Sequence, residues 1–157
     1  MKKKIINYTF ISLLVILVGI QFIRPERNIG EADGPNDITH YVPVPADVKG
    51  ILQRSCYDCH SNHTNYPWYV NINPIALFMG GHIKEGKRDL NFSDLSVMGE
   101  RRLTHKLSSI ADQVGNHHMP IGSYTLIHTN AKLNDTEIKI IKDWTVMASQ
   151  HITIRKN

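Results

Sequence analysis

The sequence predicts a small all-α domain that follows a single membrane-spanning helix at the N-terminus. Three observations support this fold class: an uncharged apolar run directly after a basic start, apolar residues at helical spacing in four later segments, and weak strand signals everywhere. The chain has 157 residues, of which 41% are hydrophobic and 20% are charged. That length suits one small globular domain in addition to the apolar helix.

The N-terminal run indicates an uncleaved signal anchor. Residues 5–23 carry no charge and follow Lys2, Lys3 and Lys4, and about 20 apolar residues are enough for a helix to cross a bilayer. Cleaved signal peptides have a shorter apolar core that ends in small residues, whereas this run ends in GIQFIRPERN. Because lysines stay on the cytoplasmic side, we expect residues 1–24 to be a single-pass anchor in the cytoplasmic membrane, with the C-terminal domain in the periplasm.

The charge distribution argues against nucleic-acid binding. The formal net charge is +4, and residues 1–24 supply all of it, with four basic side chains and no acidic one. The rest of the chain has 14 basic residues against 14 acidic ones. A formally neutral body offers no basic stripe that could follow phosphates.

Beyond the anchor, composition divides the chain into a linker, a domain and a tail. Residues 25–43 contain prolines, glycines and asparagines with no sustained period, which is typical of a linker. Residues 44–150 hold the helical patterns and form the predicted domain, and residues 151–157 form the tail. In the last helical pattern Asn134 is the expected N-cap, with Glu137 three residues later as in a capping box. The first helical pattern lies within residues 45–60, and its helix is expected to end at Cys56. The other predicted helices cover residues 74–87, 99–114 and 135–149.

Both cysteines of the chain lie in the stretch RSCYDCHSNH, at the end of the first predicted helix. A disulfide across two intervening residues would close a very short loop and gain little stability. A redox dithiol of the thioredoxin type needs a βαβ context, which is not predicted here. Zinc has four potential ligands in Cys56, Cys59, His60 and His63, but adjacent positions such as 59 and 60 rarely converge on one ion.

The pattern C-x-x-C-H is the attachment motif of c-type haem, and this interpretation is favoured. Two cysteines at this spacing can form thioethers with the two vinyl groups of one porphyrin, while the following histidine binds the iron. Cys56, Cys59 and His60 fit this chemistry in number and order. Export from the cytoplasm and the absence of other cysteines strengthen the prediction of one covalent haem c.

A histidine-bound haem iron has a second axial position, and Met119 is the preferred candidate for it. Met119 precedes Pro120 in the loop NHHMPIGSY, and proline holds the preceding residue extended so that the thioether can point inward. A His/Met pair raises the reduction potential and suits the transfer of single electrons. The neighbouring His117 and His118 are the next candidates, and bis-histidine ligation remains open. More distant alternatives are Met79, His82, Met98 and His105.

Several motifs together give the chain a family resemblance. The order of helices, CYDCH, an MP loop and a C-terminal helix with a tryptophan is similar to class I cytochrome c. The runs CYDCHSN, YPWY, HIKEG and YTLIH more closely resemble the bacterial haem-binding domain family of small membrane-anchored, cytochrome-c-like proteins, over residues 40–147. The resemblance implies covalent haem on Cys56 and Cys59, with His60 as the proximal and Met119 as the distal iron ligand.

The aromatic loop that contains Trp68 and Tyr69 is a further candidate for cofactor contact. Its rings could cover the haem edge, with the indole N–H or the phenol reaching a propionate, although packing under a loop explains them equally well. A basic docking patch for an acidic redox partner is a weaker possibility. It would consist of Lys84, Lys87, Arg88, Arg101 and Arg102.

These observations favour a membrane-tethered electron carrier over a catalyst. Such a protein would exchange electrons with redox partner proteins of a respiratory or periplasmic chain. The alternative is a haem enzyme, or a redox or gas sensor, in which the distal ligand is labile and small molecules reach the iron. A zinc-stabilised interaction module is the remote third possibility.

Overall fold

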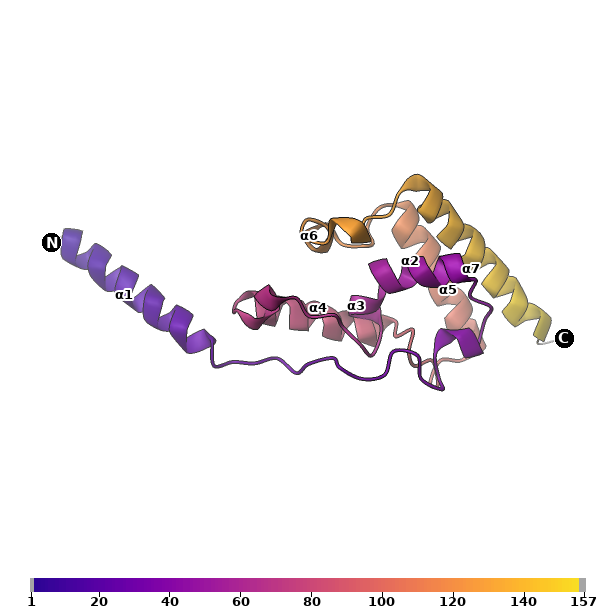
Figure 1. Ribbon diagram of the computed structural model, residues 1–157, viewed down its shortest axis with the longest axis horizontal. Helices are drawn as coiled ribbons and strands as arrows, with labels where there is room; N and C mark the ends of the chain where they lie inside the picture. Colours follow the sequence, from indigo (N-terminus) through magenta and orange to yellow (C-terminus); the bar gives the residue numbers. More distant parts are fainter. Residues whose placement is uncertain (1, 156–157) are drawn as a thin grey trace.

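The computed structural model describes residues 2–155, and over these residues it is all-helical with no strand (Figure 1). This confirms the predicted fold class. The structure has seven α-helices and three short 3₁₀ helices over that range. The longer helices are α1 (Lys2–Ile20), α2 (Ala46–Ser55), α4 (Ile75–Asp89), α5 (Glu100–Gly115) and α7 (Asp135–Arg155); the short elements are η1 (Ile38–His40), α3 (Tyr57–His60), η2 (Trp68–Asn71), α6 (Gly122–Thr125) and η3 (Thr129–Ala131).

Helix α1 extends away from the domain, and none of its residues is buried (Figure 1). By length and composition it is apolar enough to cross a membrane. A 19-residue helix whose large side chains point outward in every direction is unfavourable in water, and a bilayer removes that cost. The predicted N-terminal apolar helix is therefore present, while its orientation in a membrane stays a prediction.

The framework of the domain consists of α2, α5 and α7, with α5 and α7 packed side by side (Figure 1). The helical spacing of Leu103, Leu107 and Val114 places all three in the core. Helix α7 begins with the predicted capping box: the Glu137 amide donates to Asn134 Oδ1 at 2.9 Å, and the Asn134 amide donates to Glu137 Oε2 at 3.0 Å.

The first predicted helix ends at the C-x-x-C-H motif. Its C-terminal end was predicted at Cys56, and α2 does end at Ser55, while the rest of the motif forms a separate short helix, α3, that begins at Tyr57. Cys56 lies between them with φ −126° and ψ −38°, outside the helical range. The two cysteines therefore have different backbone settings, Cys56 in the break and Cys59 within α3.

The segment predicted as a linker, residues 25–43, is packed along the domain (Figure 1). Ile38 and Val42 are fully buried in the main core. The indole N–H of the buried Trp144 donates to the Pro43 carbonyl at 2.9 Å, which ties the segment to α7. Single apolar residues between prolines and glycines have no period, so the sequence pattern did not reveal this packing.

Candidate functional site

The C-x-x-C-H motif lines two adjoining cavities of about 350 and 410 Å³. The first cavity lies between α3, α4 and the segment around α6, and the second lies between α3, α5 and the residues after α4. Residues that border both cavities mark the centre of the site. They are Ser55, Cys56, His60, Asp89, Met119 and Pro120.

His60 is held in one orientation by the chain that follows α4. Its ring Nδ1 lies 3.0 Å from the Leu90 carbonyl oxygen, and its own carbonyl accepts the Phe92 amide at 2.7 Å. A carbonyl can only accept, so Nδ1 carries the proton and Nε2 keeps its lone pair. Burial lowers the pKa of His60, which favours the neutral imidazole. A neutral ring with a fixed tautomer and a free Nε2 is the form that binds a metal.

Cys56 and Cys59 are both free thiols. Burial, reinforced by the neighbouring Cys59, raises the pKa of Cys56 to about 12. Burial and the Asp58 carboxylate raise the pKa of Cys59 to about 11. Both thiols therefore lie in surroundings that favour the uncharged S–H form.

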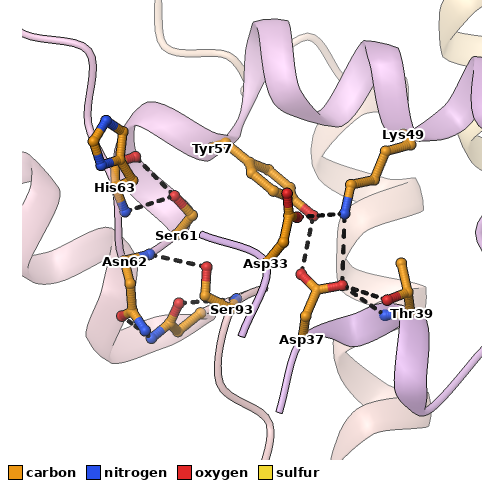
Figure 2. Close-up of polar contacts among 10 residues, drawn as sticks. Asp33, Asp37, Thr39, Lys49, Tyr57, Ser61, Asn62, His63 and Ser93 are labelled. Atoms are coloured by element: carbon orange, nitrogen blue, oxygen red, sulfur yellow. Dashed lines mark hydrogen bonds and ion pairs between the residues drawn. The ribbon is translucent and has the colours of Figure 1, made fainter. Parts of the chain in front are cut away.

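The residues after the motif form a polar network that includes Ser93 (Figure 2). The Ser61 hydroxyl donates to the His63 carbonyl at 2.8 Å and accepts the His63 amide at 3.0 Å. The ring of His63 is exposed and lies 3.2 Å from the Gly30 carbonyl. Within residues 2–155, no three His, Cys, Asp or Glu side chains gather in a way that could hold a metal ion. The arrangement therefore gives no support to the zinc alternative.

Gly86 lets α4 lie directly against the motif. A Cβ atom at this position would be 2.6 Å from the Cys59 carbonyl oxygen and 3.3 Å from the Cys59 Cβ. Only a glycine permits so close an approach of the two backbones. Gly86 belongs to the HIKEG motif, but its role could not be predicted, because a glycine inside a helix pattern carries no sign of what it faces.

Met119 is placed by the end of α5. His117 has a left-handed backbone, with φ 56°, and its amide donates to Val114 while the His118 amide donates to Gln113. These are the two hydrogen bonds of a Schellman motif, which stops the helix and turns the chain. Met119 borders both cavities and is 37% exposed. His117 and His118 are exposed and line neither cavity.

A hydrogen bond joins the segment after Met119 to the motif itself. The phenol of Tyr124 in α6 donates to Asp58 Oδ2 at 2.6 Å, and Asp58 stands between the two cysteines. Burial and this bond to the carboxylate raise the pKa of Tyr124 well above its usual range, so the phenol remains a donor. Tyr124 belongs to the YTLIH motif, which the sequence analysis quoted without assigning a function to it.

Trp68 and Tyr69 lie apart from the two cavities. Trp68 is 75% exposed and contacts the edge of the Tyr69 ring, and neither residue lines either cavity. The Tyr69 hydroxyl instead lies 2.5 Å from His128 Nε2, and the His128 ring stacks on Tyr124. The structure thus connects Tyr69 to the site only through these two rings. Its contact with a cofactor stays a prediction, as does that of Trp68.

The site has the components of a cofactor pocket: a free imidazole nitrogen, two protonated thiols and a thioether around adjoining cavities. A family model described as a haem-binding domain matches residues 15–147. The chain therefore belongs to the haem-binding domain family, and the predicted resemblance is confirmed. No curated protein and no solved structure shows significant similarity to it.

The residues of the site fit a haem. His60 offers Nε2 as an iron ligand, and Met119 offers a sulfur at the same cavities. Cys56 and Cys59 border the first cavity, as thiols that would add to vinyl groups must do. The remaining walls are largely apolar around His60, with the buried Phe92 ring at its edge.

Proposed function

We propose that this protein is a membrane-anchored electron carrier that binds one haem c. Cys56 and Cys59 would hold the group through thioethers, with His60 and Met119 as the axial iron ligands. The observation that carries this proposal is the position of His60 and Met119, which come from distant parts of the chain and border the same two cavities. A haem with this ligand pair takes up and releases one electron without an open coordination site.

The chain's own residues account for how such a group would be held. The Leu90 carbonyl orients the His60 ring and makes Nε2 a better donor, because it accepts the proton on the other nitrogen. The Schellman motif ends α5 and turns the chain, so that Met119 would face the haem from a segment other than the one that carries His60. The bond between Tyr124 and Asp58 fastens that segment to the motif.

The membrane anchor supports a role close to a respiratory or periplasmic chain. If α1 spans the cytoplasmic membrane with its lysines inside, the domain lies in the periplasm, where haem c is attached and cysteines are not kept reduced. The partners would then be redox proteins at the same membrane. Tethering confines the search for them to two dimensions and raises their effective concentration.

The experiment that tests the proposal uses the full chain, expressed with cytochrome c maturation machinery and purified in detergent. Haem colour that survives a denaturing gel would support covalent attachment. A charge-transfer band of methionine-bound ferric haem in the near infrared would support His/Met ligation. A colourless protein, or colour that is lost on denaturation, would contradict attachment through Cys56 and Cys59.

The distal ligand is tested by Met119→Ala. We expect this variant to lose the near-infrared band, to gain carbon monoxide and cyanide binding, and to have a lower reduction potential, because a soft sulfur ligand is removed. His117→Asn and His118→Ala are the matched controls, since both residues lie beside Met119 and line neither cavity. Asparagine is chosen at position 117 because it tolerates the left-handed backbone there. If either control loses the band or Met119→Ala keeps it, the ligand assignment is wrong.

A second candidate function is a haem-based sensor or enzyme with a displaceable distal ligand. The partial exposure of Met119, on a loop rather than a helix, favours this possibility. The wild-type protein distinguishes the two functions, because an electron carrier resists cyanide, whereas a sensor or enzyme binds it readily.

A further inference from the structure

We propose that the end of the domain next to α1 is a membrane-contacting surface that rests on the outer leaflet of the bilayer. We call this surface the apolar end. The inference rests on the proposed insertion of α1 in the membrane and adds to it a fixed position for the haem domain. The apolar end consists of the exposed side chains of Trp68, Ile72, Ile75, Phe78, Leu126 and Ile127.

Asn73 fastens the end of α1 to the domain. Its side-chain amide donates to the carbonyls of Ile20 and Ile23, at 2.5 and 2.6 Å. Its backbone amide and carbonyl pair with the Gln21 side chain, both at 3.0 Å. Asn73 is fully buried by these contacts. A tether that merely held the domain at a distance would need no such side chain.

The residues that follow α1 add further contacts to the same segment. Arg24 donates to the Asn71 carbonyl at 2.5 Å, and Arg27 donates to the Asn71 side chain. Pro25 packs so closely on α4 that a Cβ at Gly80 would lie 2.7 Å from the Pro25 Cβ. The exit of α1 and the start of α4 therefore form one packed unit rather than two bodies joined by a flexible chain.

This unit sets the height of the apolar end above the membrane. The uncharged part of α1, residues 5–20, rises about 24 Å. The lysines before it stay at the inner interface, so Ile20 lies near the outer boundary of a hydrocarbon core roughly 30 Å thick. Asn73, which is bonded to Ile20, must lie at the same level. Ile72 and Ile75 flank Asn73 in the chain, and they cannot be far from lipid.

Exposure and charge both suit a lipid surface. Trp68, Phe78 and Leu126 are 75%, 52% and 80% exposed, and tryptophan is enriched at membrane interfaces. The segment that contains Leu126 is joined to η2 by the contact between His128 and Tyr69. Figure 1 shows α6 and the start of α4 on the side of the domain from which α1 departs. Residues 66–84 and 113–134 contain no acidic residue, so anionic lipids would not be repelled.

The test measures whether Trp68 contacts lipid in the full-length holoprotein. Single chains are placed in nanodiscs made of ordinary lipid or of lipid brominated near the top of its acyl chains, and tryptophan emission is compared. Trp68→Phe is the reference, because the only other tryptophan, Trp144, lies in the core. Haem quenches emission alike in both kinds of disc, so the ratio of the two signals reports the bromine alone.

We expect brominated lipid to remove at least roughly half of the Trp68 contribution, and to leave the emission of Trp68→Phe unchanged. The double variant Phe78→Ser/Leu126→Ser should weaken the quenching. The control is Val97→Ser, which alters an exposed apolar residue outside the apolar end. The inference would be overturned if the ratio of tryptophan emission in brominated lipid to that in ordinary lipid were the same for the wild type and for Trp68→Phe.

Two further outcomes separate this inference from the proposed function. Resistance of the protein to alkaline extraction from vesicles, together with an intact haem spectrum, shows that the anchor and the cofactor are in place. If quenching is absent under those conditions, only the membrane-contacting surface is wrong. If Trp68 is instead protected from water-soluble quenchers only when discs hold two chains, a second copy covers the apolar end and the inference is also wrong.

Discussion

The two sides of the site differ in how firmly the chain holds them. His60 is partly buried, its ring is bonded to the Leu90 carbonyl, and its backbone carbonyl is bonded to the Phe92 amide. Gly86 allows α4 to press directly against this side. Met119 lies on a partly exposed loop, and the bonds that position it involve the backbone after α5 and the side chain of Tyr124.

We call the part of the site around His60 the prepared side, and the loop of Met119 with α6 the adjustable side. The orientation of His60 is determined by packing that is independent of a bound group, so this ligand should be in place before the cofactor enters. The Met119 side can move with little disturbance of the core, because residues 116–127 contribute no side chain to the main hydrophobic cluster. The lability of the distal ligand therefore depends on the loop and α6, and changes there should alter ligand access before they alter haem retention.

The largest effect is expected from His60→Ala, which removes the ligand on the prepared side. The variant should lose the low-spin haem spectrum completely, although the cysteines can still react. His105→Ala is the control, because His105 lies exposed on α5. An unchanged spectrum of His60→Ala, in both oxidation states, would exclude His60 as an iron ligand.

The next effect tests the packing behind His60. Gly86→Ala places a Cβ against the Cys59 backbone, which cannot move aside as a flexible side chain could, and overpacking of this kind costs about 1–3 kcal/mol. The control is Gly81→Ala in the same helix, where an added Cβ has no neighbour within 4 Å. This change should stabilise α4 by up to about 1 kcal/mol. Thermal midpoints of the two holoproteins in detergent provide the measurement. A Gly86→Ala protein as stable as Gly81→Ala would show that α4 does not press on the motif.

The smallest effect is expected on the adjustable side. Tyr124→Phe removes one hydrogen bond to a carboxylate on a segment that can move, and should speed cyanide binding only severalfold, without loss of haem. The matched control is Asn134→Ala, which removes the cap of α7 at a cost of about 1 kcal/mol but lies in the framework. Stopped-flow cyanide binding distinguishes the two, and equal rates in both variants would remove the distinction between the two sides.

The parts of the molecule that were predicted from sequence are those with local causes. The apolar face of α5, the capping box of α7 and the uncharged run of α1 each depend on residues within a few turns of one another. The C-x-x-C-H motif is equally local, because its chemistry depends on a spacing of five residues. The end of the first helix at Cys56 was predicted, whereas the separate short helix α3 that follows it was not.

The remainder depends on contacts between distant residues, which a single sequence does not show. His60 meets Leu90 across 30 positions, Tyr124 meets Asp58 across 66, and Trp144 meets Pro43 across 101. Nothing in the sequence around Asn73 indicates a special role. Only the structure shows that its side-chain amide donates to the carbonyls at the end of α1.

The sequence by itself determined the all-α class, the apolar N-terminal helix and the haem-binding domain family, because local spacing and short motifs are sufficient for each. Only the tertiary structure decided that Met119 borders the cavities while His117 and His118 do not, and that residues 25–43 are packed against the domain. The physical reason is that helix formation and capping are governed by near neighbours, whereas the direction of a side chain and the close approach of two backbones depend on how the helices pack.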